Sequence, residues 1–220
     1  MKTAILLGGS GLVGSFLLTE LLNNPAYITV IVVVRQPLSI QHPKLITLIG
    51  NYETLPSLKK ELMADDVFIC IGTTKKKEPN QKLYYLVDHD YPVLFARLCK
   101  ENGASSVFVV SAMGANINSK VFYSRTKGEM ERDIIALDHA STNIFRPSVL
   151  IGKRNEKRIV EQVAANVLTI IQPLLVGELL SKYRGIKANI IAIAMNKSAT
   201  KSNDKLKYYY WKEMNNMVVQ

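Results

Sequence analysis

The chain has 220 residues, of which 48% are hydrophobic and 21% are charged, and its formal net charge is +10. This composition excludes disordered, collagen-like and low-complexity proteins, and the length predicts one domain over residues 1–220. Two cysteines, Cys70 and Cys99, are too few for a disulfide framework and fall inside apolar runs, which indicates reduced thiols. No apolar run has the length of a signal sequence or a membrane span. We therefore expect a cytoplasmic protein with no membrane partner.

Short apolar runs alternate with helical patterns, which is typical of a parallel sheet covered on both faces. Strands are predicted over residues 3–7, 28–34, 44–49, 67–71, 107–110 and 143–145. Helices are predicted over 12–22, 83–101 and 124–137. Pro92 should kink the second helix or mark its start, and Gly103 should end it. The fold class is therefore α/β, a doubly wound parallel sheet of the NAD(P)-binding Rossmann type.

The alternation weakens in the last third of the chain. Helices are predicted over residues 159–171 and 186–195, a strand over 206–211 and a final helical segment over 212–217. Residues from about 150 to 200 are expected to add a small cap on the substrate side, over the carboxyl edge of the sheet.

A glycine-rich loop directly follows the first predicted strand and opens the first helix. Its predicted cofactor-binding residues are Gly8, Ser10, Gly11, Leu12, Val13 and Gly14. Small residues permit a tight turn, let a pyrophosphate approach the backbone and let the helix pack near the strand. The alternative is a glycine turn without a ligand. A nucleoside-triphosphate loop is disfavoured, because Ser15 stands where that motif requires lysine.

The end of the second predicted strand carries Arg35 and no nearby acid. An NAD-specific site places an acid there, on the ribose 2′-hydroxyl, whereas a guanidinium pairs with a 2′-phosphate. We therefore expect NADP(H) to be preferred over NAD(H). The alternative is a surface arginine at a strand end.

Three side chains form a candidate acid–base group. Tyr123 and Lys127 lie four residues apart on one predicted helix face, and Ser111 follows the fifth strand, at the edge where such sheets bind ligands. An adjacent ammonium and a cationic nicotinamide would both lower the pKa of the phenol. Tyr123 would then exchange a proton with a substrate carbonyl to which Ser111 donates a hydrogen bond. A chance occurrence of the Tyr-x-x-x-Lys spacing is the alternative.

The glycine loop, Ser111, Tyr123 and Lys127 resemble the short-chain dehydrogenase/reductase superfamily. The segments 70–74, 87–91, 123–129 and 145–150 resemble its atypical branch, which contains the Tat-interacting-protein oxidoreductases and NmrA- or epimerase-like proteins. The resemblance implies that Gly72 and Thr73 line the adenosine side of the site. It also implies that Lys127 reaches the nicotinamide ribose and that Pro147 and Val149 lie beside the nicotinamide. The sequence departs from the superfamily at Asp88, where asparagine is common, and in the extra glycine Gly9.

Other residues have simpler interpretations. His42, His89 and His139 lack ligand partners at suitable spacing, so no metal site is expected. Residues 182–220 hold eight basic and two acidic residues, which indicates either a polyanion-binding surface or, as we prefer, solubilising charge. Nucleic acid is therefore not an expected partner, and the tyrosines at 208–210 are interpreted as a strand with alternating burial.

These patterns predict an NADP(H)-dependent oxidoreductase that transfers a hydride to or from a small carbonyl or alcohol substrate. The competing hypothesis is an NADP(H)-binding sensor without turnover, which contacts a protein or polyanion partner. The sequence leaves the substrate, epimerase chemistry and the oligomeric state open, a homodimer included.

Overall fold

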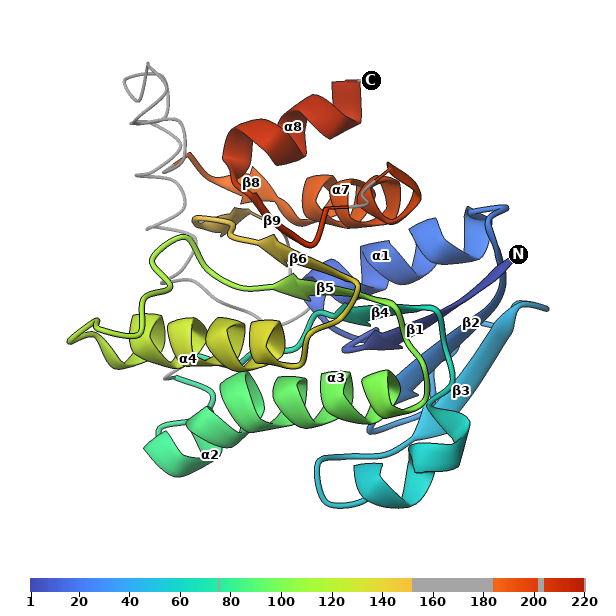
Figure 1. The fold of residues 1–220 in the computed structure, drawn as a ribbon, viewed down its shortest axis with the longest axis horizontal. Helices are drawn as coiled ribbons and strands as arrows, with labels where there is room; N and C mark the ends of the chain where they lie inside the picture. The colour runs from blue at the N-terminus through green and yellow to red at the C-terminus, as the bar shows by residue number, and fades with distance from the viewer. Residues whose placement is uncertain (75, 152–183, 202–203, 220) are drawn as a thin grey trace.

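Seven parallel strands form one sheet, in the order β3-β2-β1-β4-β5-β6-β9 (Figure 1). The computed structural model describes residues 1–74, 76–151, 184–201 and 204–219. The strands of the sheet are β1 (Lys2–Leu7), β2 (Tyr27–Val34), β3 (Leu45–Ile49), β4 (Asp66–Ile69), β5 (Ser106–Val110), β6 (Ser141–Phe145) and β9 (Leu206–Tyr209). Two short strands, β7 (Leu150–Ile151) and β8 (Ile186–Lys187), pair with each other separately. The strand order reverses between β1 and β4, which confirms the predicted doubly wound Rossmann topology.

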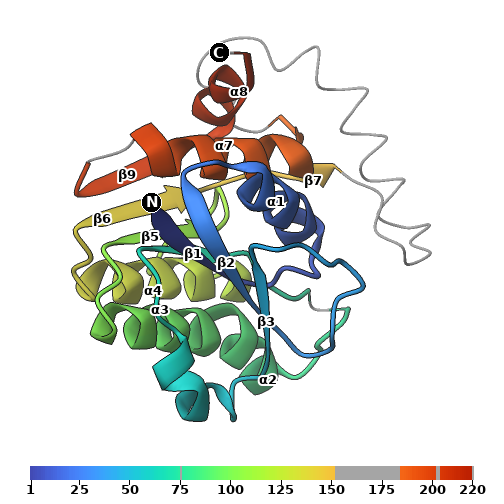
Figure 2. The ribbon, with the colours of Figure 1, turned by 90° about the vertical axis from the view of Figure 1, so that its right-hand side faces the viewer.

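Helices cover both faces of this sheet (Figures 1 and 2). On one face lie α1 (Leu12–Asn23) and α7 (Ala188–Lys201), with α8 (Trp211–Val219) packed on α7. On the other face lie α2 (Gln81–Tyr85), α3 (Tyr91–Glu101) and α4 (Phe122–Ala136), while a 3₁₀ helix, η1 (Leu55–Glu61), packs beside α3. Successive residues of a strand point to opposite faces, so Leu6 joins the core under α1 and Leu7 the core under α3.

The predicted helix over 83–101 is interrupted. A π-helical turn, η2 (Leu86–Asp90), separates α2 from α3, and Pro92 lies in the first turn of α3. Proline has no N–H to donate to the carbonyl four residues earlier, so the widened turn ends where Pro92 enters. Asp88 on this turn is buried, and His89 bridges to Asp133 of α4 through Nε2 at 2.9 Å.

The carboxyl-terminal elements differ from the prediction at their bounds. The helix expected from residue 186 begins at Ala188, because residues 186–187 pair as β8, and the last strand ends at Tyr209. Burial along β9 rises from the exposed Leu206 through the half-buried Lys207 and Tyr208 to the buried Tyr209, so the expected alternation of burial is not seen. Residues 152–183, with the predicted helix 159–171 and most of the cap, lie outside the described residues, so the cap stays a prediction. Among the residues that are described, no helix is long and apolar enough to cross a membrane.

Candidate cofactor and catalytic site

The glycine loop forms a tight turn between β1 and α1. Gly8 adopts φ +96°, a left-handed conformation that favours glycine, and the Gly11 N–H donates to its carbonyl at 2.9 Å. A Cβ on Gly14 would lie 2.1 Å from the same carbonyl oxygen, so α1 packs against the turn at a distance that excludes any side chain. Gly11 caps α1 without a side chain, which leaves the first N–H groups of the helix available to an anion.

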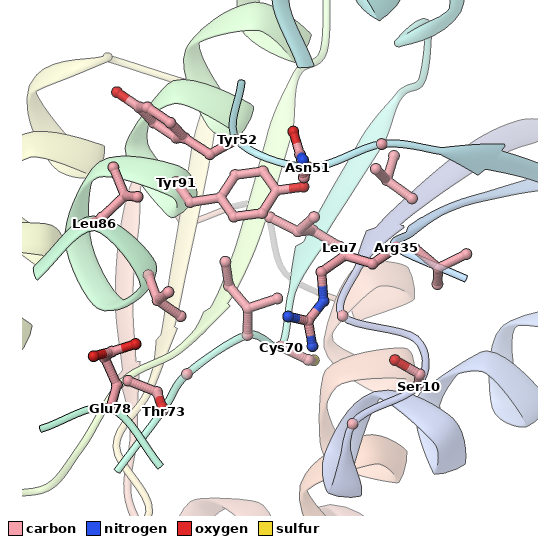
Figure 3. Close-up of a pocket in the computed structure, with 18 of the residues that line it drawn as sticks. Leu7, Ser10, Arg35, Asn51, Tyr52, Cys70, Thr73, Glu78, Leu86 and Tyr91 are labelled. Atoms are coloured by element: carbon pink, nitrogen blue, oxygen red, sulfur yellow. The ribbon is translucent and has the colours of Figure 1, made fainter. Parts of the chain in front are cut away.

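A cavity of about 780 Å³ opens above this loop, along the carboxyl ends of β1 to β4 (Figure 3). Six predicted cofactor-binding residues lie together in its wall: Gly8, Ser10, Gly11, Arg35, Gly72 and Thr73. The other six lie outside its lining: Leu12, Val13, Gly14, Lys127, Pro147 and Val149. Of these, Val13 belongs to the hydrophobic core, and the carbonyl of Val149 accepts from the Ile186 N–H at 2.9 Å.

Arg35 extends from the end of β2 into the cavity, between Tyr91 and Ser10 (Figure 3). Burial raises the pKa of Tyr91 to about 12, and the nearby charge of Arg35 opposes that rise. Arg35 is exposed and lines the cavity, so its guanidinium can pair with an anion bound there.

Sequence reasoning missed much of the cavity wall. The missed residues include six at or just after the ends of β1 to β4, namely Leu7, Val33, Val34, Gly50, Cys70 and Ile71. They also include Asn51, Tyr52 and Glu53 after β3, Lys77 and Glu78, Leu86 and Val87 of η2, and Tyr91 of α3. The carboxyl end of the predicted third strand was the available signal, because ligands of such sheets bind at that edge. The contribution of η2 had no signal in the hydrophobic pattern, although the resemblance to the atypical branch included segment 87–91.

Ser111 lies at the carboxyl end of β5 and is buried. Its backbone N–H donates to the Phe145 carbonyl at 2.7 Å, which fixes the residue against β6. Its hydroxyl has no hydrogen-bond partner among the described residues. A buried hydroxyl without a partner is costly, so this atom is suited to bind a ligand.

Lys127 lies on α4, one turn after Tyr123, and is held by Asp88 of η2. Its Nζ is 3.0 Å from Asp88 Oδ1, and both side chains are buried. The other oxygen of Asp88 accepts the Thr73 N–H at 2.7 Å, so this carboxylate joins the cavity wall to Lys127. Burial lowers the pKa of Lys127, but the Asp88 charge and hydrogen bond, with Tyr123 and Glu131, raise it above its ordinary value.

Tyr123 is 42% exposed at the amino end of α4. Burial raises the pKa of its phenol, Lys127 lowers it, and Asp88 raises it again, so the net pKa lies above the ordinary value. Lys127 acts on the Tyr123 pKa in the expected direction, but in the protein without cofactor the effect of burial outweighs it. Burial is the largest cause of the raised pKa, and the Asp88 charge adds to it.

A second buried ion pair lies one helical turn beyond Lys127. Glu131 accepts two hydrogen bonds from Arg146, which follows β6. The guanidinium also lies 4.5 Å from the ring centre of Tyr208 and donates to the Tyr210 hydroxyl at 3.1 Å. Arg146 thus connects α4 to the tyrosines at the end of the sheet. It also pairs with Glu131, the carboxylate one turn from Lys127 on α4.

The residues present fit a dinucleotide with a nicotinamide. The glycine turn offers free N–H groups at a helix terminus, the cavity holds a guanidinium, and Ser111 has a buried hydroxyl without a partner. Among the described residues, no group of three or more His, Cys, Asp or Glu side chains could hold a metal ion.

Comparison with known proteins gives the family. A family described as NAD(P)H-binding matches residues 8–171. The FMP52 protein of Candida albicans is 33% identical over 159 residues, which cover 70% of this chain and 69% of that protein. The FMP52 protein of Eremothecium gossypii is 30% identical over 151 residues, 69% of this chain and 67% of that protein.

Both relatives are named as mitochondrial proteins, and so is the FMP52 protein of Saccharomyces cerevisiae. The expectation of a cytoplasmic protein is therefore wrong. It rested on composition and on apolar runs, and neither of these reports an organelle.

Solved structures give the same fold. The UDP-glucuronic acid 4-epimerase of Bacillus cereus, in complex with NAD, superposes with a TM-score of 0.67 at 14% identity and covers 96% of this chain and 78% of its own. At that identity the likeness concerns the fold alone. With the sheet order, the glycine turn and the family match, it establishes an NAD(P)-binding Rossmann domain. The chain therefore belongs to the NAD(P)H-binding family, in which the mitochondrial FMP52 proteins are its relatives.

Proposed function

We propose that this protein is an NADP(H)-dependent oxidoreductase that acts on a small carbonyl or alcohol substrate. One observation carries the proposal: Asp88 connects the cofactor cavity, through the Thr73 N–H, to the ammonium of Lys127 next to Tyr123. The match to an NAD(P)H-binding family and the resemblance of the Ser111, Tyr123 and Lys127 set to short-chain dehydrogenases support the same activity. The names of the FMP52 relatives support a mitochondrial location.

The proposed roles follow from the chemistry of each side chain. A bound nicotinamide supplies or accepts the hydride. The Tyr123 phenol exchanges a proton with the substrate oxygen, and the Ser111 hydroxyl donates a hydrogen bond to that oxygen. Lys127 stabilises the phenolate that forms when Tyr123 gives up its proton. The phosphates would contact the glycine turn, and Gly72 and Thr73 the adenosine side.

The preference for NADP(H) rests on Arg35. A guanidinium inside the cavity can make a charge-assisted pair with a 2′-phosphate, which NAD(H) lacks. An Arg35→Asp variant is expected to lose NADPH affinity by about 100-fold while NADH affinity changes little or rises. Titration by cofactor fluorescence measures both affinities, with Arg35→Met separating loss of the cation from gain of an acid. Equal losses for the two cofactors would contradict the assignment.

A second function, an NADP(H) sensor without turnover, is favoured by the raised pKa of Tyr123. Burial and the Asp88 charge keep the phenol protonated, and Lys127 is committed to Asp88. A protein that only binds the cofactor has no need of a phenolate.

Turnover on a panel of carbonyl substrates with NADPH separates the two functions. The oxidoreductase predicts turnover in the wild type and a loss of at least about 100-fold in Tyr123→Phe, with cofactor affinity unchanged. Tyr85→Phe, which removes a tyrosine hydroxyl that is hydrogen-bonded to Glu129, is the matched control. Tight NADPH binding without turnover on a broad panel would favour the sensor, and absence of cofactor binding would contradict both.

A further inference from the structure

The carboxylate of Asp88 contacts both the wall of the cofactor cavity and Lys127 of the candidate acid–base group. It is 1% exposed and comes from the π-helical turn η2, not from α4 or from the cavity loop. One oxygen contacts Lys127 and the other accepts from Thr73. Gly72 lies beside this contact: a Cβ there would lie 3.3 Å from Asp88 Oδ1, so the carboxylate would have to shift by a few tenths of an ångström.

A buried ammonium requires a counter-charge, since removal from water disfavours its charged form. Among the described residues, the titratable groups that act on Lys127 are Asp88, Tyr123 and Glu131. Glu131 is engaged by Arg146, and Tyr123 is neutral while its pKa stays raised. Asp88 is the carboxylate in direct contact, so it keeps the ammonium charged.

The direction of Lys127 is fixed in the same way. An ammonium on a four-carbon stem is flexible unless a partner holds it. Asp88 is itself anchored by the 2.7 Å bond from the Thr73 N–H, which belongs to the cavity wall. The position of the Lys127 ammonium therefore depends on the wall of the cofactor cavity as well as on α4.

We propose that Asp88 is a positioning residue, which holds the Lys127 ammonium charged and oriented between the wall of the cofactor cavity and Tyr123. The expected effect of Asp88 on turnover rests on the proposed oxidoreductase function. The expected effect of Asp88 on the charge state of Lys127 is independent of that function, because this charge state can be measured in the protein without substrate.

The test compares Asp88→Asn with the wild type. Asparagine has nearly the same shape and can still accept the Thr73 N–H, but it has no charge to offer Lys127. Lysine labelled with ¹³C at Cε reports the titration of Lys127 by NMR, with Lys127→Met to assign the signal. The pKa of Lys127 is expected to be lower in Asp88→Asn than in the wild type. Asp90→Asn, on the same turn but bonded to His89 through its carboxylate, is the matched control and should leave the titration unchanged.

Kinetics give the second readout. Asp88→Asn is expected to lower kcat by at least about tenfold and to leave the KM for NADPH within about threefold, because the contact with Thr73 is retained. A merely structural role for Asp88 would reduce the amount of folded protein without moving the titration of Lys127. A wild-type titration of Lys127 in folded Asp88→Asn would overturn the inference, whether or not the protein has turnover. If neither wild type nor variant turns over and the titration moves, the proposed function fails while the inference stands.

A double variant covers the case in which Asp88→Asn does not fold. Asp88→Asn combined with Lys127→Met removes both charges and leaves no unpaired ion inside the protein. Recovery of folding in the double variant supports the inference, because the unpaired ammonium is then the cause of the defect. Failure of both variants to fold would overturn it, since the contact with Thr73 or the shape of the side chain would then be what matters.

Discussion

The two halves of the carboxyl edge of the sheet are built in different ways. Beside β1 and β2, the site consists of a glycine turn and a helix terminus, where Gly8 and Gly14 leave room for backbone to approach backbone. Beside β5 and β6, it consists of buried charges, in which Asp88 pairs with Lys127 and Glu131 with Arg146. The glycine half has room for a ligand because its glycines have no side chains. The charged half holds its reactive groups in place by ion pairs.

This difference determines how each half responds to change. The glycine half should be least tolerant of an added atom at Gly14, because all the nearest atoms that a Cβ would meet there belong to the backbone. The charged half should accept changes of shape more readily than the loss of one charge, because removal of one partner leaves the other ion buried and unpaired.

Gly14→Ala is expected to have the largest effect. Its Cβ would lie 2.1 Å from the Gly8 carbonyl oxygen, and neither the turn nor α1 can move without disturbing the other. We expect a loss of stability of at least about 4 kcal/mol and loss of NADPH binding. Denaturant unfolding and NADPH titration measure these effects, with Ser15→Ala on the exposed side of the same turn as control. A stable Gly14→Ala protein that binds NADPH normally would show that the glycine half does accept an added side-chain atom.

Arg146→Met tests the charged half. It leaves Glu131 buried without its partner and removes the contact with the Tyr208 ring. We expect a loss of about 3 to 5 kcal/mol in denaturant unfolding. The pair Glu131→Gln and Arg146→Met together should recover part of that loss, because no unpaired charge remains. Additive losses in the double variant would show that the charges do not act as a pair.

A smaller effect on stability is expected from protonation of His139, a buried residue in the loop that joins α4 to β6. Its Nδ1 lies 3.2 Å from the Ala104 carbonyl oxygen. Burial lowers its pKa to about 4. The unfolded chain therefore binds a proton between pH 6.5 and 4 that the folded protein does not, so stability falls as pH falls through this window. The loss should reach about 3 kcal/mol at pH 4.

His139→Gln should flatten this part of the stability curve, measured as unfolding free energy at several pH values. His42→Gln, a change at a half-buried histidine in the loop before β3, is the control. An unchanged slope in His139→Gln would assign the acid sensitivity to other groups.

The features that the sequence predicted are local in the chain. The glycine turn follows one strand and opens one helix, Arg35 ends a strand, and the apolar runs alternate with helical patterns, so neighbouring residues carry all the information. Within the described residues, the cores of the predicted strands and helices are confirmed for this reason. The bounds near Pro92 and at residue 186 differ, because a π-helical turn and a two-residue strand depend on pairing with distant segments.

The amino-acid sequence by itself determined the Rossmann topology and the position of the cofactor turn, since both follow from hydrophobic periodicity and from the absence of side chains at Gly8, Gly11 and Gly14. Only the tertiary structure decided the state of the acid–base group. The charge that Lys127 presents to Tyr123 depends on Asp88, which another element brings within 3.0 Å. Electrostatic energy depends on the distance between charges and on their burial, and the spacing of residues along a chain gives neither quantity for residues on different elements.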